Sequence, residues 1–152
     1  METVFKAEQV YIISNRLGVN QKDVKLVIDT YVDKLLSKVK EGQIVKFLNI
    51  CYLVPDNVSG SRYQETLSYI SNDIGNETKL GKEMVFRILS ELSNFISSDL
   101  KKFYSYTIRG IVHIYLEEYK RGVFKVRVRK SKVLRDLGVG IVTMNSFKRK
   151  VE

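Results

Sequence analysis

Residues 11–18 read YIISNRLG, and residues 68–75 read SYISNDIG, so the same pattern returns at an offset of 57. Apolar residues coincide in the two segments: Val10 with Leu67, Ile13 with Ile70, and Leu17 with Ile74. Their spacing is that of an amphipathic helix, and a glycine, Gly18 or Gly75, follows the last apolar position. The sequence therefore predicts two similar short helices, each ended by its glycine.

A longer amphipathic segment follows each short one, and these two segments match at an offset of 61. Helical spacing of apolar residues runs through residues 24–39 in the first segment and 85–100 in the second. The offset changes by four because residues 76–80 are expected to form a longer loop. Asn20 is a predicted N-cap of the first long helix, and Gly42 its predicted end.

The match continues into a strand-like stretch. Residues 45–53, VKFLNICYL, align with residues 106–114, YTIRGIVHI, again at an offset of 61. A single offset that spans a helix and a strand without a gap is rare by chance. We therefore predict a tandem duplication of one helix-helix-strand unit in an α+β protein.

The two copies differ after this strand. The first runs into a polar linker at residues 54–61. The second passes a predicted tight turn at residues 120–122 and enters residues 123–129, where Phe124, Val126 and Val128 alternate with cations. Such alternation places the apolar side chains on one face of a strand and the cations on the other. A short helix is expected at residues 132–137, stopped by Gly138.

The chain resembles the HU/IHF family of DNA-binding proteins. Both strand segments are similar to the family's V-x-L-x-G-F-G-x-F signature: Gly110 stands at its first glycine, whereas the first copy has Asn49 there. Cys51 and Val112 replace the second glycine. Residues 128–137 look like the family's F-K-P-G-K-x-L-K-D-x ending. Together the resemblance covers residues 5–53 and 63–137.

In that family two protomers intertwine and share one core, so the resemblance implies that both units of this chain form an intramolecular pseudo-dimer. We expect a first HU/IHF-like unit at residues 1–54 and a linker at 55–62. A second unit with a short β-hairpin and a terminal helix is expected at 63–137, and a basic C-terminal tail at 138–152. Pairing of the units within or between chains is left open.

One departure from the family concerns its DNA-bending arms, which are long ribbons with a proline at the tip. The first unit has no arm, and the second has only the short turn at residues 120–122. Pro55, the single proline, lies in the linker without basic neighbours. Strong DNA bending in the family manner is therefore not expected.

The positive charge is concentrated at one end of the chain. Residues 1–118 hold 15 Lys/Arg and 15 Asp/Glu, whereas residues 119–152 hold 11 Lys/Arg and two acidic residues, which gives the net charge of +9. Such a patch attracts polyanions or an acidic protein face. The alternative is a solvated edge strand that charge protects from aggregation. The expected binding residues are Lys120, Arg121, Lys125, Arg127, Arg129, Lys130, Lys132, Arg135, Lys148, Arg149 and Lys150.

The tail also carries apolar residues that need burial. Ile141, Val142, Met144 and Phe147 are predicted subunit contacts, although packing on the chain's own core is an equal alternative.

No candidate catalytic centre, metal site or cofactor site emerges from the sequence. His113 is the single histidine, and Cys51 is the single cysteine, expected to be a small buried thiol. Phosphate-loop, zinc and nucleophile motifs are absent from the sequence. We therefore predict a protein that is not an enzyme and that binds no small-molecule substrate.

Two functions remain. Phages encode HU/IHF-like proteins beside their virion structural genes, so the resemblance suggests a structural role, such as a ring or adaptor at the portal, neck or tail. Its partners would be other virion proteins, double-stranded DNA or further copies of the chain. The alternative is a nucleoid-type protein that coats double-stranded DNA without sequence preference. The expected location is the virion or the host cytoplasm, neither secreted nor in a membrane.

Overall fold

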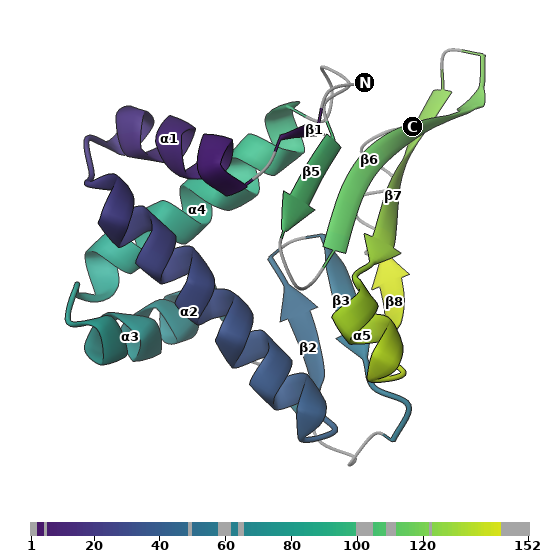
Figure 1. Cartoon of the computed structure of the whole chain (residues 1–152), viewed down its shortest axis with the longest axis horizontal. Helices are drawn as coiled ribbons and strands as arrows, with labels where there is room; N and C mark the ends of the chain where they lie inside the picture. Colours follow the sequence, from purple (N-terminus) through teal and green to yellow (C-terminus); the bar gives the residue numbers. More distant parts are fainter. Residues whose placement is uncertain are drawn as a thin grey trace.

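A computed structural model describes residues 3–4, 6–48, 50–57, 62–63, 66–99, 105–108, 112–121 and 123–143. Within these ranges the chain is an α+β protein, as expected, and Figure 1 shows helices α1–α4 gathered on one side and the sheets on the other. The helices are α1 (Lys6–Leu17), α2 (Gln21–Lys40), α3 (Leu67–Thr78), α4 (Lys82–Asp99) and α5 (Lys132–Asp136). The strands are β1 (Thr3–Val4), β2 (Ile44–Phe47), β3 (Cys51–Val54), β4 (Arg62–Tyr63), β5 (Ser105–Ile108), β6 (Val112–Lys120), β7 (Val123–Lys130) and β8 (Gly140–Thr143).

The predicted end of α1 and both predicted boundaries of α2 are confirmed. Gly18 follows α1 with a φ of 65°, a conformation that glycine adopts without a Cβ penalty. The Asn20 side chain accepts a hydrogen bond from the backbone N–H of Lys22 (2.8 Å), so it caps α2. Helix α2 ends at Lys40, and Gly42 has a φ of 84°.

The predicted end of α3 at Gly75 is wrong. Gly75 lies inside the helix, which runs on to Thr78 and ends at Lys79 with a left-handed φ of 62°. The glycine serves close packing instead, because a Cβ there would lie 2.6 Å from the carbonyl carbon of Gly81. The backbone N–H of Gly81 donates to the carbonyl oxygen of Gly75 (3.2 Å), so the α3–α4 turn folds back onto the helix.

Each predicted long strand is in fact a hairpin of two strands. The stretch 45–53 turns between β2 and β3, which pair antiparallel, and Leu48 in the turn has a φ of 47°. The stretch 106–114 likewise divides into β5 and β6, which also pair antiparallel. The chain therefore reverses its direction within each stretch, and the two strands of each hairpin lie side by side.

The two hairpins have the same register. Val45 pairs with Leu53 and Phe47 with Cys51 in the first, and Tyr106 pairs with Ile114 and Ile108 with Val112 in the second. Each residue of the second set lies 61 positions after its counterpart. The offset found in the sequence is therefore also an offset in strand pairing.

Short strands that precede α1 and α3 extend these hairpins crosswise. Strand β1, before α1, pairs parallel with β5 of the second half, and β4, before α3, pairs parallel with β2 of the first half. The described strands thus form two four-stranded sheets, ordered β1-β5-β6-β7 and β4-β2-β3-β8. Each half contributes an edge to the sheet of the other. Arg62, at the end of the predicted linker, already belongs to β4.

Strand β8 changes the interpretation of residues 138–152 as a separate tail. It pairs antiparallel with β3, in the place that β7 occupies beside β6. The predicted terminal helix α5 is confirmed, with the Ser131 side chain as N-cap, and it leads through Gly138 (φ 70°) into β8. The C-terminal segment thus returns to complete the sheet of the first half.

Buried side chains from both halves form one apolar cluster. Its largest fully buried members are Phe47, Phe95, Ile13, Leu35, Ile50, Leu53, Ile74, Ile88, Leu89, Leu92 and Ile96. Leu134 of α5 and Val139 beside β8 join the same cluster, so the C-terminal segment is anchored in it. None of the helices in the described part of the chain combines the length and apolar content that crossing a membrane requires.

Candidate nucleic-acid interface

The strongest candidate interface is the ribbon formed by β6 and β7. Eight residue pairs join the two strands antiparallel, from Val112 with Lys130 to Lys120 with Val123. The pairing of Lys120 with Val123 confirms the hairpin expected there. The register shifts between Glu118 and Lys120, where a bulge strengthens the local twist. In Figure 1 the ribbon extends past the rest of the sheet at its turn end.

The pairing separates the ribbon into two faces. Val128 lies opposite Ile114 and Val126 opposite Leu116, which gives one face of aliphatic positions. On the other face Arg129 lies opposite His113, Arg127 opposite Tyr115, and Lys125 opposite Glu117. Directly paired residues in an antiparallel ladder share a face, so one side of β7 presents three cationic positions in succession.

Burial shows which face is turned to solvent. Arg127 and Arg129 are exposed, whereas Val128 between them is partly buried and packs against the core. The core therefore fixes the strand at Val128 and presents the arginines outward. The cationic face predicted from alternation is confirmed at these two residues.

His113 belongs to this face, where the sequence had not placed it, because it had been considered only as the single histidine. Burial lowers the pKa of His113, and the charge of Arg129 lowers it further. The imidazole is therefore neutral at pH 7, and a nearby anion would reverse the effect of Arg129. The signal was present in the sequence, because His113 alternates with Val112 and Ile114 and so cannot share their face.

The other predicted cations lie in three places. Lys120 ends β6, and Arg121 is exposed in the turn, so both are at the tip of the ribbon. Lys130 pairs with Val112 and thus falls on the aliphatic face, where it is half-buried. Lys132 and Arg135 are exposed on α5, in the helix that follows β7. Lys148, Arg149 and Lys150 lie outside the described residues.

The first sheet lacks the matching cations at its described positions. In the second sheet, Thr107 pairs with His113, and His113 pairs with Arg129. The equivalent row of the first sheet is Lys46, which pairs with Tyr52, and Tyr52 pairs with Val142. Val142 thus occupies the place of Arg129, and Gly140 that of Arg127. Arg127 and Arg129 therefore have no cationic counterparts on β8, although the exposed Lys46 lies in the same row of the first sheet.

The predicted subunit contacts in the tail divide into two groups. Ile141 is partly buried and packs against the core of its own chain, which was the alternative to a subunit contact. Val142 is 54% exposed, so contact with another subunit stays a prediction for it. Met144 and Phe147 lie outside the described residues.

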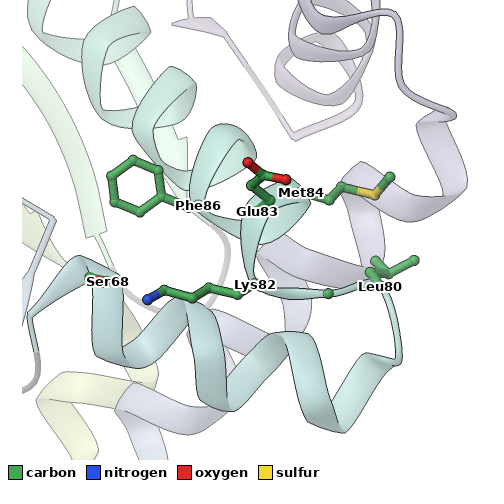
Figure 2. A pocket seen from close by; sticks show the side chains of 7 residues that line it. Ser68, Leu80, Lys82, Glu83, Met84 and Phe86 are labelled. Atoms are coloured by element: carbon green, nitrogen blue, oxygen red, sulfur yellow. The ribbon is translucent and has the colours of Figure 1, made fainter.

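A second surface feature is an open groove at the α3–α4 turn, seen from close by in Figure 2. Leu80, Met84 and Phe86 line it together with Ser68, Lys82 and Glu83. Among the described residues, no group of three or more His, Cys, Asp or Glu could hold a metal ion.

Cys51 is buried in the core, and burial raises the pKa of its thiol to about 12. The thiol is therefore protonated at neutral pH and has the character of a small apolar side chain. This confirms the buried thiol expected from the sequence.

No model of a known protein family matches the chain, and no curated protein is similar to it in sequence.

Proposed function

We propose that this protein is a tandem-duplicated, HU/IHF-like pseudo-dimer that binds double-stranded nucleic acid without sequence preference through the β6–β7 ribbon. The shared register of the two hairpins supports the duplication, since the same residue positions pair at the offset that aligns the sequences. The crosswise strands β1 and β4 support intertwined halves, because each half adds a strand to the other's sheet.

The observation that carries the binding proposal is the exposed pair Arg127 and Arg129 on a strand anchored by Val128. Side chains two residues apart on a strand are about 6.6–6.8 Å apart. Successive phosphates of one DNA strand rise by about 3.4 Å along the axis and also wind around it, so the through-space separation of neighbouring phosphates is larger than this rise and comparable with the spacing of the two arginines. Lys125 continues the same row by its pairing opposite Glu117.

The form of the ribbon indicates how binding would occur. Strands β6 and β7 pair as far as Lys120 and Val123, which only two residues separate in the sequence, so the ribbon is short. The first sheet carries Val142 where the second has Arg129. A single short ribbon can contact the phosphates along one stretch of a nucleic-acid strand. We therefore expect salt-sensitive binding without the wedge that bends DNA in the arm-bearing members of the family.

The deciding experiment is titration of a labelled random-sequence duplex across a salt series. The wild-type affinity should fall as salt rises, and Arg127→Ala/Arg129→Ala should weaken binding and lower the log–log salt slope by about 2. Lys22→Ala/Lys25→Ala is the matched control, because it removes two exposed charges from α2 and changes the net charge equally. Equal loss in both double variants would mean that net charge, and not this face, causes the binding. Weak binding of the wild type at every salt concentration would reject the proposal.

A structural role in an assembly, such as a phage virion ring or adaptor, is the second candidate. Exposed apolar side chains near the C-terminal segment favour it: Val133 is 43% exposed, Leu137 37% and Val142 54%. The phage assignment itself rests on the family resemblance. Sedimentation of the wild type should then show a homo-oligomer that Val133→Ser/Leu137→Ser disrupts. An oligomer unchanged by this variant, or a monomeric wild type, would argue against that surface as a subunit contact.

A further inference from the structure

We infer that charge at the helical interface makes each half of the chain pair with the other half and not with a copy of itself. The starting point is a set of equivalent positions. Arg16 in α1 and Asp73 in α3 are related by the offset of 57, and Lys34 in α2 and Phe95 in α4 by the offset of 61. The inference uses the duplication proposed above but not nucleic-acid binding, so failure of the duplex titration leaves it intact.

The first contact between the halves joins α1 to α4. Arg16 Nη1 lies 3.1 Å from Glu91 Oε1, and the Arg16 guanidinium lies 5.2 Å from the centroid of the Phe95 ring. The ring face attracts the cation, and the carboxylate neutralises it. A cation on the short helix is thus held by an anion and an aromatic ring on the long helix of the other half.

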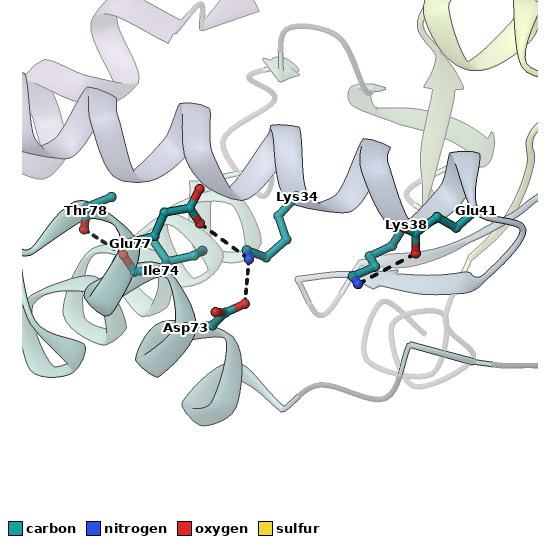
Figure 3. Close-up of polar contacts among 7 residues, drawn as sticks. All are labelled: Lys34, Lys38, Glu41, Asp73, Ile74, Glu77 and Thr78. Atoms are coloured by element: carbon teal, nitrogen blue, oxygen red, sulfur yellow. Dashed lines mark hydrogen bonds and ion pairs between the residues drawn. The ribbon is translucent and has the colours of Figure 1, made fainter.

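The second contact joins α3 to α2 and uses the equivalent positions with other chemistry (Figure 3). Lys34 Nζ lies 2.5 Å from Asp73 Oδ2 and 3.5 Å from Glu77 Oε2. Burial lowers the pKa of Lys34, but the hydrogen bond and charge of Asp73 and the charge of Glu77 outweigh this, so the pKa is raised. Here the short helix supplies the anions, and the long helix supplies the cation.

The same pair of positions therefore meets twice, with opposite charge on the short helix. Position 16 faces position 95, and position 73 faces position 34. Two first halves paired with each other would place Arg16 against Lys34 of the second copy, twice. Two second halves would place Asp73 against Glu91 and Phe95. Both self-pairings bring like charges together, whereas the observed pairing brings opposite charges together.

The consequence is a body built from one first half and one second half, in the same chain or exchanged between two copies. Such a body always carries one β6–β7 ribbon and one β3–β8 edge. Pairing of two second halves, which would place two ribbons on one body, is opposed by the charges of Asp73 and Glu91.

Exchange of the short-helix residues in the full-length protein tests the inference. Arg16→Asp/Asp73→Arg leaves the net charge unchanged, but it places a carboxylate at position 16 beside Glu91 and a guanidinium at position 73 beside Lys34. We expect the melting temperature to fall by roughly 3–6 °C. Lys22→Glu/Glu83→Lys is the matched control: it exchanges charges at equivalent exposed positions in the first turns of α2 and α4, and should change the melting temperature by less than about 2 °C.

A variant that restores opposite charges at both contacts distinguishes an effect of charge pairing from local damage to packing. Addition of Lys34→Glu and Glu91→Arg to the double variant again keeps the net charge and recreates two opposite-charge pairs. This fourfold variant should recover most of the lost melting temperature. A double variant as stable as the control would overturn the inference. So would a fourfold variant no more stable than the double one, because the loss would then come from packing and not from charge pairing.

Discussion

The phenolic oxygen of Tyr31 accepts a hydrogen bond from the backbone N–H of Leu48, at 3.0 Å and inside the core. Tyr31 lies on α2, and Leu48 lies in the β2–β3 turn with a φ of 47°. The rings of Tyr31 and Phe47 are 6.1 Å apart between centroids. One side chain of the long helix thus holds the turn that reverses the chain into β3, and through β3 it supports β8.

Substitution Tyr31→Phe should destabilise the protein, because it removes the acceptor and leaves the buried N–H of Leu48 without it. A buried donor that loses its partner costs about 1–3 kcal/mol. Chemical denaturation of wild type and variant measures the difference in the free energy of unfolding. Tyr69→Phe is the matched control, since Tyr69 is 59% exposed. Equal stability of Tyr31→Phe and wild type would show that this hydrogen bond does not hold the turn.

A second prediction concerns the close approach at Gly75. Gly75→Ala should destabilise the protein by about 1–3 kcal/mol, because its Cβ would meet the backbone of Gly81 and Lys82 at 2.6 Å and force the α3–α4 turn to move. Alanine is otherwise the better helix former, so propensity alone predicts a gain. Asn76→Ala, at the next helical and exposed position, isolates that propensity effect. A stabilised Gly75→Ala variant would contradict the packing role.

The sequence predicted the elements better than their connections. Periodicity identified α1, α2 and α4 and the cationic face of β7, because apolar spacing is a local property. It missed the reversals at Leu48 and between β5 and β6. No glycine marks the first reversal in the sequence, because a hydrogen bond from Leu48 to Tyr31, on the preceding helix α2, supports it. The role of Gly75 was also predicted wrongly, because a glycine needed for close packing looks identical in sequence to one that ends a helix.

The C-terminal strand illustrates a further limit. Ile141 and Val142 signalled a segment in need of burial, but its site beside β3 depends on pairing with residues about 90 positions earlier in the chain. Alternation along one strand cannot reveal its partner. The absence of a matching cationic row from the described part of the first sheet follows from that partner, because β8 supplies Val142 where β7 supplies Arg129.

A third prediction concerns the thiol of Cys51. Because burial raises its pKa to about 12, the thiolate that reacts with disulfide reagents and alkylating agents is nearly absent at pH 8. Native protein should therefore react with a thiol reagent only through opening of the core, and unfolded protein should react at once. Time courses in buffer and in denaturant provide the measurement. Rapid stoichiometric reaction of the native protein would show that Cys51 is accessible.

The last prediction links protonation of His113 to anion binding. In the free protein, burial and Arg129 hold the pKa of His113 below its usual value. The group therefore contributes stability above about pH 6.5, and this stability is lost as the pH falls through the lowered pKa of the folded state. A phosphate bound at Arg129 opposes the charge of the arginine and raises the pKa of His113, so binding takes up a proton in this range.

Duplex affinity should consequently rise as the pH falls from about 7.5 to 5.5, by roughly two- to tenfold, since one pKa unit corresponds to at most a tenfold change. His113 is the only histidine of the chain, so His113→Asn removes the imidazole titration from the window. The variant should bind with a weaker pH dependence, and the difference between the two profiles cancels titration of the N-terminal amine. Identical pH profiles for wild type and His113→Asn would place the bound phosphates away from Arg129, even if the duplex still binds elsewhere on the basic C-terminal part of the chain.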